Sequence, residues 1–331
     1  MTASSPSLSI AIIYNLVTDR HRVDVNSVVD GVASIQAALE TLGHRVTPVP
    51  LNDGILPFIR QLDALQPDLI FNLCEGFGEQ SSGEYCVAGL LELLGIPYTG
   101  AGPFALALAL DKPTAKQLFL AAGITTPAFR VCRDGQLPAP GLSYPLFLKL
   151  AGEDASLGIT TANVVYDDTS CRRRLEVLFA EHHAPVLAEE FIEGREFTVA
   201  MLDREPLVLE EIAFTVEPRI VSYRAKWATG SDEDLGTRAI FEPMVTVAQR
   251  ARMLETAIRA CDVIGTRDYA RVDFRMNDRD EIYVLEVNPN PDITPNSGYR
   301  GALEAIGFPF PDFVQRIVTS ALNRSRLASS G

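Results

Sequence analysis

The sequence predicts an α/β protein whose N-terminal part is a doubly wound parallel sheet. Strand and helix patterns alternate along residues 8–72, which is the order expected of successive βαβ units. The first strand pattern, LSIAIIY at residues 8–14, is a short apolar run typical of a strand buried on both faces. Towards the C-terminus, strand patterns at 270–276 and 282–288 are separated only by a short polar turn. That spacing is typical of an antiparallel hairpin, so the C-terminal part is expected to be α+β.

Local signals justify the individual elements. Helical periodicity from Val28 to Leu42 ends at Gly43, a residue suited to the end of a helix. Asp111 can cap a helix that has Pro113 in its first turn. The expected helices lie at 28–42, 55–65, 85–94, 103–110, 111–122, 246–264 and 311–323. The remaining expected strands lie at 45–48, 68–72, 129–131, 146–150, 186–192 and 195–202.

Composition excludes several classes of protein. The 331 residues carry a formal net charge of −14, which disfavours binding to nucleic acid or to an anionic membrane. Five scattered cysteines without metal-site spacing indicate reduced thiols. The N-terminus lacks the pattern of a signal peptide, and no apolar run is long enough to cross a membrane. We therefore expect a cytoplasmic protein.

The C-terminal hairpin carries the strongest chemical signal. Asp273 lies in its first strand, and Glu286 and Asn288 lie in its second. Strict alternation of side chains predicts Val284 on the same face as Glu286, with Leu285 on the opposite face. Carboxylate and amide oxygens are the ligands that Mg²⁺ prefers, so the three polar residues form a predicted metal site. The alternative is a surface hairpin whose charges are solvated.

Three further segments are candidates for binding a ligand. Lys149 stands among large apolar residues and precedes a small polar loop at 151–158 that could fold over phosphates. The alternative is that this lysine reaches outward to solvent. The loop at 72–84 mixes glutamates with glycines, which let a backbone approach a ligand closely. Residues 221–238, which include Lys226, lack periodicity and are expected to form a long irregular loop.

In their order along the chain, these residues resemble the ATP-grasp ligases, and among them the D-alanine–D-alanine ligase group. The resemblance covers about residues 8–320. Its most specific parts are GIPYTGAGPFALALALDKPTAKQLFLAAGI, EEFIEGREFTVAML and RVDFRMNDRDEIYVLEVNPNPDITPNS. It implies an N-terminal α/β domain at 1–103 followed by two ATP-grasp subdomains that hold the nucleotide between them. These would be a central lid subdomain at 104–190 and a C-terminal subdomain at 191–331.

The resemblance also implies roles for residues that match the family's positions. ATP is expected to contact Lys112, Lys149, Glu189, Glu190, Phe191, Ile192, Glu196, Phe274 and Leu285. Two Mg²⁺ ions are expected at Asp273, Glu286 and Asn288. The residues expected to act in catalysis are Arg271, Lys226, Glu75 and Ser156. The residues expected to hold the substrates are Asp24, Glu75, Lys226, Asp292, Ser297 and Gly298.

The implied reaction joins a carboxylate to an amine in two steps. The carboxylate attacks the γ-phosphate of ATP, giving an acyl phosphate and ADP, and an amine then displaces phosphate. The loops at 151–158 and 221–238 are the candidate lids that would exclude water. The resemblance further implies a homodimer formed through the N-terminal sheet or its helices.

Departures from the family pattern concern the substrate pocket. Ala155 replaces a serine, Trp227 replaces a tyrosine, Glu75 stands where a histidine is usual, and Asp292 replaces a glycine. Because an indole has no hydroxyl, the usual hydrogen-bonded triad cannot form. Three functions therefore stay open: D-alanine–D-alanine ligation, ligation of a different amino acid or small carboxylate, and nucleotide binding without turnover.

Overall fold

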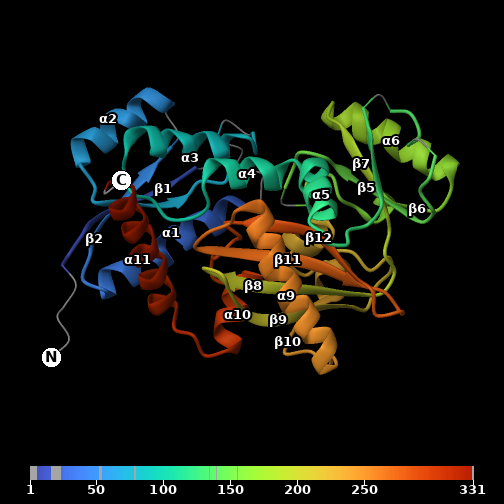
Figure 1. Cartoon of the computed structure of the whole chain (residues 1–331). Helices are drawn as coiled ribbons and strands as arrows, with labels where there is room; N and C mark the ends of the chain where they lie inside the picture. The colour runs from blue at the N-terminus through green and yellow to red at the C-terminus, as the bar shows by residue number, and fades with distance from the viewer. Residues whose placement is uncertain are drawn as a thin grey trace.

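The computed structural model describes residues 6–15, 24–51, 54–77, 80–133, 135–138, 140–154 and 156–329, without the side chains of 24–27 and 328–329. Its strands form three sheets, one parallel and two antiparallel, which succeed one another along the chain (Figure 1). This arrangement confirms the predicted α/β class, with a parallel N-terminal sheet and α+β units after it. Among the described helices, none is long and apolar enough to span a membrane.

The N-terminal sheet is a small parallel sheet covered by helices on both faces. Its strands are β1 (Ser9–Tyr14), β2 (Arg45–Pro50) and β3 (Leu69–Leu73), in the order β2-β1-β3. One face packs on α2 (Ile55–Leu65) and α3 (Gly83–Leu94), and the other packs on α1 (Asp24–Thr41) and α11 (Phe310–Ser329). Side chains alternate between the two cores along β1, since Ile10 and Ile12 face one core and Ala11 and Ile13 face the other.

The middle of the chain forms a four-stranded antiparallel sheet. In spatial order its strands are β4 (Phe129–Cys132), β7 (Val186–Glu190), β5 (Leu146–Leu150) and β6 (Val164–Val165). Helix α6 (Asp168–His182), which the sequence did not predict, packs against β5, β6 and β7. Helices α4 (Pro103–Leu110) and α5 (Lys112–Ala121) lead into this sheet. Both contact α9 (Val247–Ile264) and β12 (Ile282–Pro289) of the C-terminal part.

The C-terminal part is built on a five-stranded antiparallel sheet. In spatial order its strands are β10 (Thr237–Phe241), β9 (Glu205–Phe214), β8 (Arg195–Leu202), β11 (Tyr269–Met276) and β12 (Ile282–Pro289). Helix α9 (Val247–Ile264) packs on this sheet and contributes Met253, Ala257 and Ala260 to its core. Helix α10 (Gly298–Ala305) lies beyond the end of β12 and contacts β9 and β10.

The prediction of an irregular loop at 221–238 is wrong. The segment contains the short helices α7 (Tyr223–Trp227) and α8 (Asp232–Leu235) and the start of β10. Ser222 and Ser231 cap the two helices by accepting hydrogen bonds from backbone N–H groups. Helices of five and four residues are too short to show an apolar repeat in the sequence, whereas their capping serines are a signal that the sequence does contain.

The strict alternation predicted for the C-terminal hairpin is also wrong at one point. Asp273 pairs with Glu286, but its neighbour Phe274 pairs with Val284, so Leu285 is an extra residue on β12. This β-bulge shifts the phase of the strand. Val284 therefore lies in the core, fully buried, while Leu285 and Glu286 both line the cavity described below.

A buried carboxylate joins the N-terminal and C-terminal parts. Asp268, which is only 1% exposed, accepts a hydrogen bond of 2.7 Å from the Gly100 backbone N–H. It also forms an ion pair with Arg324 of α11, whose guanidinium donates to the Tyr98 carbonyl at 3.0 Å. Three segments that are far apart in the sequence therefore meet at one charge.

We expect Asp268→Asn to lower the free energy of unfolding by roughly 2–4 kcal/mol, because it leaves the Arg324 guanidinium partly buried without its counter-charge. Asparagine tolerates the left-handed backbone of this position, where φ is 62°. The matched control is Asp262→Asn, whose ion pair with Arg204 is at the surface and should matter by less than about 1 kcal/mol. Urea unfolding measures both variants, and equal losses would contradict the assigned role of Asp268.

Candidate active site

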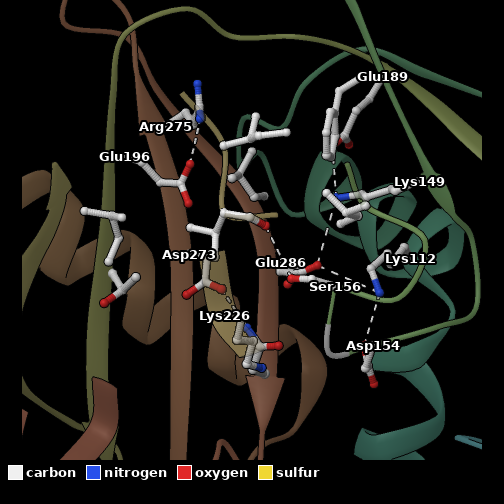
Figure 2. A pocket seen from close by; sticks show the side chains of 18 of the residues that line it. Lys112, Lys149, Asp154, Ser156, Glu189, Glu196, Lys226, Asp273, Arg275 and Glu286 are labelled. Atoms are coloured by element: carbon white, nitrogen blue, oxygen red, sulfur yellow. Dashed lines mark hydrogen bonds and ion pairs between the residues drawn. The ribbon is translucent and has the colours of Figure 1, made fainter. Parts of the chain in front are cut away.

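A cavity of about 270 Å³ lies between the two antiparallel sheets. It is lined by fifteen of the predicted site residues: Lys112, Lys149, Ser156, Glu189, Glu190, Phe191, Ile192, Glu196, Lys226, Arg271, Asp273, Leu285, Glu286, Asn288 and Gly298. Figure 2 shows the charged members converging from the two sheets and from α5. Residues from five widely separated stretches of the sequence thus meet in one place.

The predicted metal ligands lie together on the cavity face of β11 and β12. Asp273 is opposite Glu286 in the strand register, and Arg271 is opposite Asn288. The Asn288 amide donates to Asp273 Oδ2 at 2.8 Å, and Arg271 binds both oxygens of Asp273 at 2.7 and 2.9 Å. Burial disfavours the charge of Arg271, but the Asp273 carboxylate outweighs burial and raises the pKa of this guanidinium.

The donor set fits Mg²⁺ in its chemistry. Within the described part of the chain, no three His, Cys, Asp or Glu side chains gather around one point. The group here has two carboxylates, Asp273 and Glu286, with the Asn288 amide as its third member. Such a set leaves most of the coordination shell to phosphate oxygens and water, as is usual for Mg²⁺ bound together with a nucleotide.

Two lysines face Glu286 from the other side of the cavity. Lys112 Nζ and Lys149 Nζ each lie 3.9 Å from Glu286 Oε2 (Figure 2). Burial alone would raise the pKa of Glu286, but these lysines and Arg271 lower it to about 2. Lys112 also donates to the Glu153 carbonyl at 2.5 Å and to Asp154 at 3.1 Å. Lys149 is thus buried and lines the cavity, so the alternative of an outward-pointing lysine is wrong, while its role in binding ATP stays a prediction.

Lys116 is a residue of this network that the sequence did not single out. It is 1% exposed, pairs with Glu189 Oε2 at 2.8 Å and donates to Thr126 Oγ1 at 2.7 Å. The other oxygen of Glu189 lies 2.9 Å from Lys149 Nζ. Burial lowers the pKa of Lys116 to about 8, with Lys149 acting in the same direction against the pull of Glu189. Its position one helical turn after Lys112 was the available signal, since residues four apart share a helix face.

The far end of the cavity combines apolar and charged groups. Arg275 binds Glu196 at 2.7 Å and lies over the Phe191 ring, 4.7 Å from its centroid. Burial raises the pKa of Glu196, although Arg275 opposes that shift. Leu285, placed on this face by the bulge, adds an apolar wall. This end of the cavity can receive a flat ring beside its apolar side chains and a sugar hydroxyl beside its carboxylate.

Several predicted residues do not line this cavity. Phe274 is fully buried in the opposite core, because alternation turns it away from Asp273. Ser297 caps α10, where its hydroxyl accepts a hydrogen bond from the Arg300 N–H. The side chain of Asp24 lies outside the described residues, as does Ala155.

Glu75 and Asp292 line a second, smaller cavity of about 60 Å³. Trp227 and the buried Asn72 also line it, and its walls come from β3, α1 and the segment after β12. Lys226 lines the larger cavity, and its charge interacts with Glu75 and Asp292 of the smaller one. It therefore lies between the two cavities. Loss of solvent and the nearby Arg271 lower the pKa of Lys226, and the acids oppose that shift. Three of the four positions at which the sequence departs from the family, Glu75, Trp227 and Asp292, therefore line this smaller cavity, and the fourth, Ala155, lies outside the described residues.

The two candidate lids contact each other above the larger cavity. The Ser156 hydroxyl donates to the Val221 carbonyl at 3.4 Å, and the Tyr223 N–H donates to the Ile159 carbonyl at 3.0 Å. Ser81 also donates to Glu153 at 2.7 Å, which ties the first lid to the N-terminal part.

Glu210 on β9 is a second site residue that the sequence did not single out. It lines the cavity with only 4% of its surface exposed. Burial raises its pKa to about 7, against the opposing effects of Thr198 and Arg271. It lies in the strand pattern LVLEEIAF next to a second glutamate, where sequence alone gives no indication of which acid faces inward.

Two antiparallel sheets with a lysine-and-carboxylate cavity between them define an ATP-grasp protein. The family model described as "D-ala D-ala ligase C-terminus" matches residues 121–319. D-alanine–D-alanine ligases from Gloeobacter violaceus and Syntrophotalea carbinolica are each 35% identical to this chain. These alignments cover 90% and 87% of the chain, and 95% and 89% of the relatives. The chain belongs to the D-alanine–D-alanine ligase family.

The fold agrees with solved structures of the same family. The D-alanine–D-alanine ligase of Bacillus anthracis, in a crystal structure with ATP, has a TM-score of 0.77 at 23% identity. That comparison covers 97% of this chain and all of the other. A protein from Sinorhizobium fredii described only as uncharacterized, y4sG, is 30% identical over 88% of this chain and 87% of its own length. Family membership makes this chain an ATP-dependent, ADP-forming ligase, as the sequence predicted.

The raised pKa of Glu210 has a measurable consequence for stability. A carboxyl whose pKa rises from 4.5 to about 7 on folding stabilises the fold while protonated, and that contribution is lost as the pH rises through 7. We therefore expect Glu210→Gln to be more stable than the wild type by about 3 kcal/mol at pH 8 and by only about 1 kcal/mol at pH 5.

Urea unfolding between pH 5 and 8 measures this difference. Glu255→Gln, the same replacement on the exposed side of α9, serves as the matched control. If the difference in unfolding free energy between Glu210→Gln and the wild type stays constant over this pH range, the Glu210 carboxyl has an ordinary pKa and the prediction is contradicted.

Proposed function

We propose that this protein activates a substrate carboxylate with ATP and joins it to an amine, and that D-alanine, the substrate in the names of its relatives, is the donor acid. The observation that carries the proposal is Glu286, which faces two lysines at 3.9 Å while it stands beside Asp273 and Asn288. Such a site has cations for phosphate oxygens and oxygen donors for Mg²⁺ within a few ångströms of each other.

Each residue has a part in this reaction. Lys112 and Lys149 would offset the phosphate charge, and Asp273, Glu286 and Asn288 would hold up to two Mg²⁺ ions. Bound Mg²⁺ neutralises charge that builds on the transferred phosphoryl group. Arg271, held by Asp273, presents its remaining N–H groups where an oxyanion would form. The contact between the lids at Ser156 and Val221 would keep water from the acyl phosphate.

A second candidate is ligation of a different amino acid or small carboxylate. Glu75, Trp227 and Asp292 around the smaller cavity favour it, because they change the charge and shape of the space beside Lys226. Specificity follows from such contacts more than from the fold. The residues that would serve ATP and metal are unaffected by this choice.

Phosphate release across a panel of amino acids and small carboxylates, each with ATP and Mg²⁺, tests the proposal. Release with D-alanine supports D-alanine as donor, and release only with other acids supports the second candidate. Glu286→Gln should lower the rate by at least about a hundredfold, because it removes a metal ligand and the counter-charge of both lysines. If the protein binds ATP tightly but releases phosphate with no combination of acid and amine, the proposal is contradicted. That outcome would favour a nucleotide-binding protein without turnover.

Two broader features belong to the same proposal. We infer a homodimer formed through the N-terminal helices, which is supported by exposed apolar side chains on α2, α3 and α4: Leu56, Leu93 and Phe104. The division of the chain into an N-terminal domain and two ATP-grasp subdomains, at residues 103 and 190, stays a prediction. The separate hydrophobic core of the middle sheet supports it.

A further inference from the structure

The acids that line the larger cavity differ in how their charge is balanced. Five of them face a cation within 4 Å: Asp154, Glu189, Glu196, Asp273 and Glu286. The other three, Glu153, Glu190 and Glu210, form no ion pair among the described residues, and of these Glu210 alone is buried. Burying a carboxylate without a counter-charge is costly, so its presence here calls for a ligand that balances it.

Glu210 stands in a row of side chains that crosses the sheet from the metal ligands. In the strand register Glu286 pairs with Asp273, Asp273 with Thr198, and Thr198 with Glu210. Thr198 Oγ1 donates to Glu210 Oε2 at 3.1 Å, and this is the one hydrogen bond of the Glu210 side chain within the described residues. Arg271 influences Glu210 electrostatically, but its guanidinium is already bound to both oxygens of Asp273.

Gly298, the first residue of α10, leaves space in front of this carboxylate. A Cβ atom at Gly298 would lie 3.9 and 4.0 Å from the two Glu210 oxygens and within 4 Å of no other atom. Any larger side chain would therefore extend into the space beside the carboxylate. With glycine, Glu210 remains open to a group that enters the cavity.

The groups expected to hold the carboxylate of an incoming amino acid are Lys226 and Ser297. Ser297 accepts a hydrogen bond where it caps α10, and Lys226 shares its charge with Glu75 and Asp292. A carboxylate entering near Gly298 would meet the Glu210 carboxylate within a few ångströms, where like charges repel strongly. A cation at the same point would be attracted.

We propose that Glu210 is a specificity residue that pairs with a cationic nitrogen of the acceptor, so that the acceptor is a diamine or a basic amino acid. One amine of such a molecule would attack the activated acid, and its second nitrogen, still protonated, would lie between Glu210 and Gly298. This inference rests on the proposed carboxylate–amine ligation and adds the chemical class of the second substrate. The raised pKa of Glu210 agrees with it, because a bound cation supplies the counter-charge that the free protein lacks.

Matched acceptors separate charge from size. With ATP, Mg²⁺ and the best donor acid, kcat/KM is measured for 1,4-diaminobutane against butylamine, and for ornithine against norvaline. The wild type should prefer the member of each pair that carries the additional cationic nitrogen, by at least about tenfold. Glu210→Gln should reduce this preference to about twofold or less, because it keeps the size of the side chain and removes its charge. Glu211→Gln, which changes the neighbouring acid bound to Arg195, should retain the preference.

Hydroxylamine, which is uncharged at neutral pH, separates this inference from the proposed function. It should trap the activated donor as a hydroxamate equally well in the wild type and in Glu210→Gln. If no donor gives a hydroxamate in the wild type, the proposed function fails and the inference fails with it. If hydroxamate forms but the cationic acceptors are not preferred, or remain preferred in Glu210→Gln, the inference alone is overturned.

Discussion

The site depends on one electrostatic arrangement, in which Glu286 of the C-terminal sheet faces Lys112 and Lys149 across the cavity. A carboxylate and two ammonium groups that are largely removed from water stabilise one another only while they stay together. Lys149 is fixed further by Glu189, which is itself held by Lys116. The charges of the middle sheet are thus matched to those of the C-terminal sheet before any nucleotide enters, and a bound phosphate would extend the same pattern of alternating charge.

The β-bulge at Leu285 allows one strand to serve two ends of the cavity. Without it, alternation would place Leu285 in the core and Val284 beside Glu286. With it, an apolar side chain and a carboxylate face the same space, while Val284 still packs in the core. Bulges are frequent beside active sites because they redirect a side chain without ending the strand. Here the redirected residue adds an apolar side chain to the lining of the cavity.

The sequence predicted the parallel N-terminal sheet and the oxygen ligands of the C-terminal hairpin because their signals are local, whereas most other candidate site residues were predicted only through the resemblance to a family. An Ile-rich strand, a capped helix at Asp111 and the carboxylates of the C-terminal hairpin can each be recognised within about ten residues. Lys116 and Glu210 were missed because their roles arise from contacts with distant segments. Phe274 was misplaced for the opposite reason, since a family position was applied where strand alternation already turned it inward. The bulge was missed because it interrupts the strand periodicity on which such predictions depend. The helices α7 and α8 were missed because they are too short to show helical periodicity.

The central claim is that this cavity phosphorylates a carboxylate before any amine takes part. Positional isotope exchange tests it most directly, with ATP that carries heavy oxygen in the bridge between the β- and γ-phosphates. Incubated with the donor acid and Mg²⁺ but no acceptor, the enzyme should scramble this oxygen into the non-bridging β-positions, because ADP and the acyl phosphate recombine while both are bound. Absence of scrambling in an enzyme that releases phosphate once an amine is added would contradict the claim, since it would mean that no acyl phosphate forms on its own.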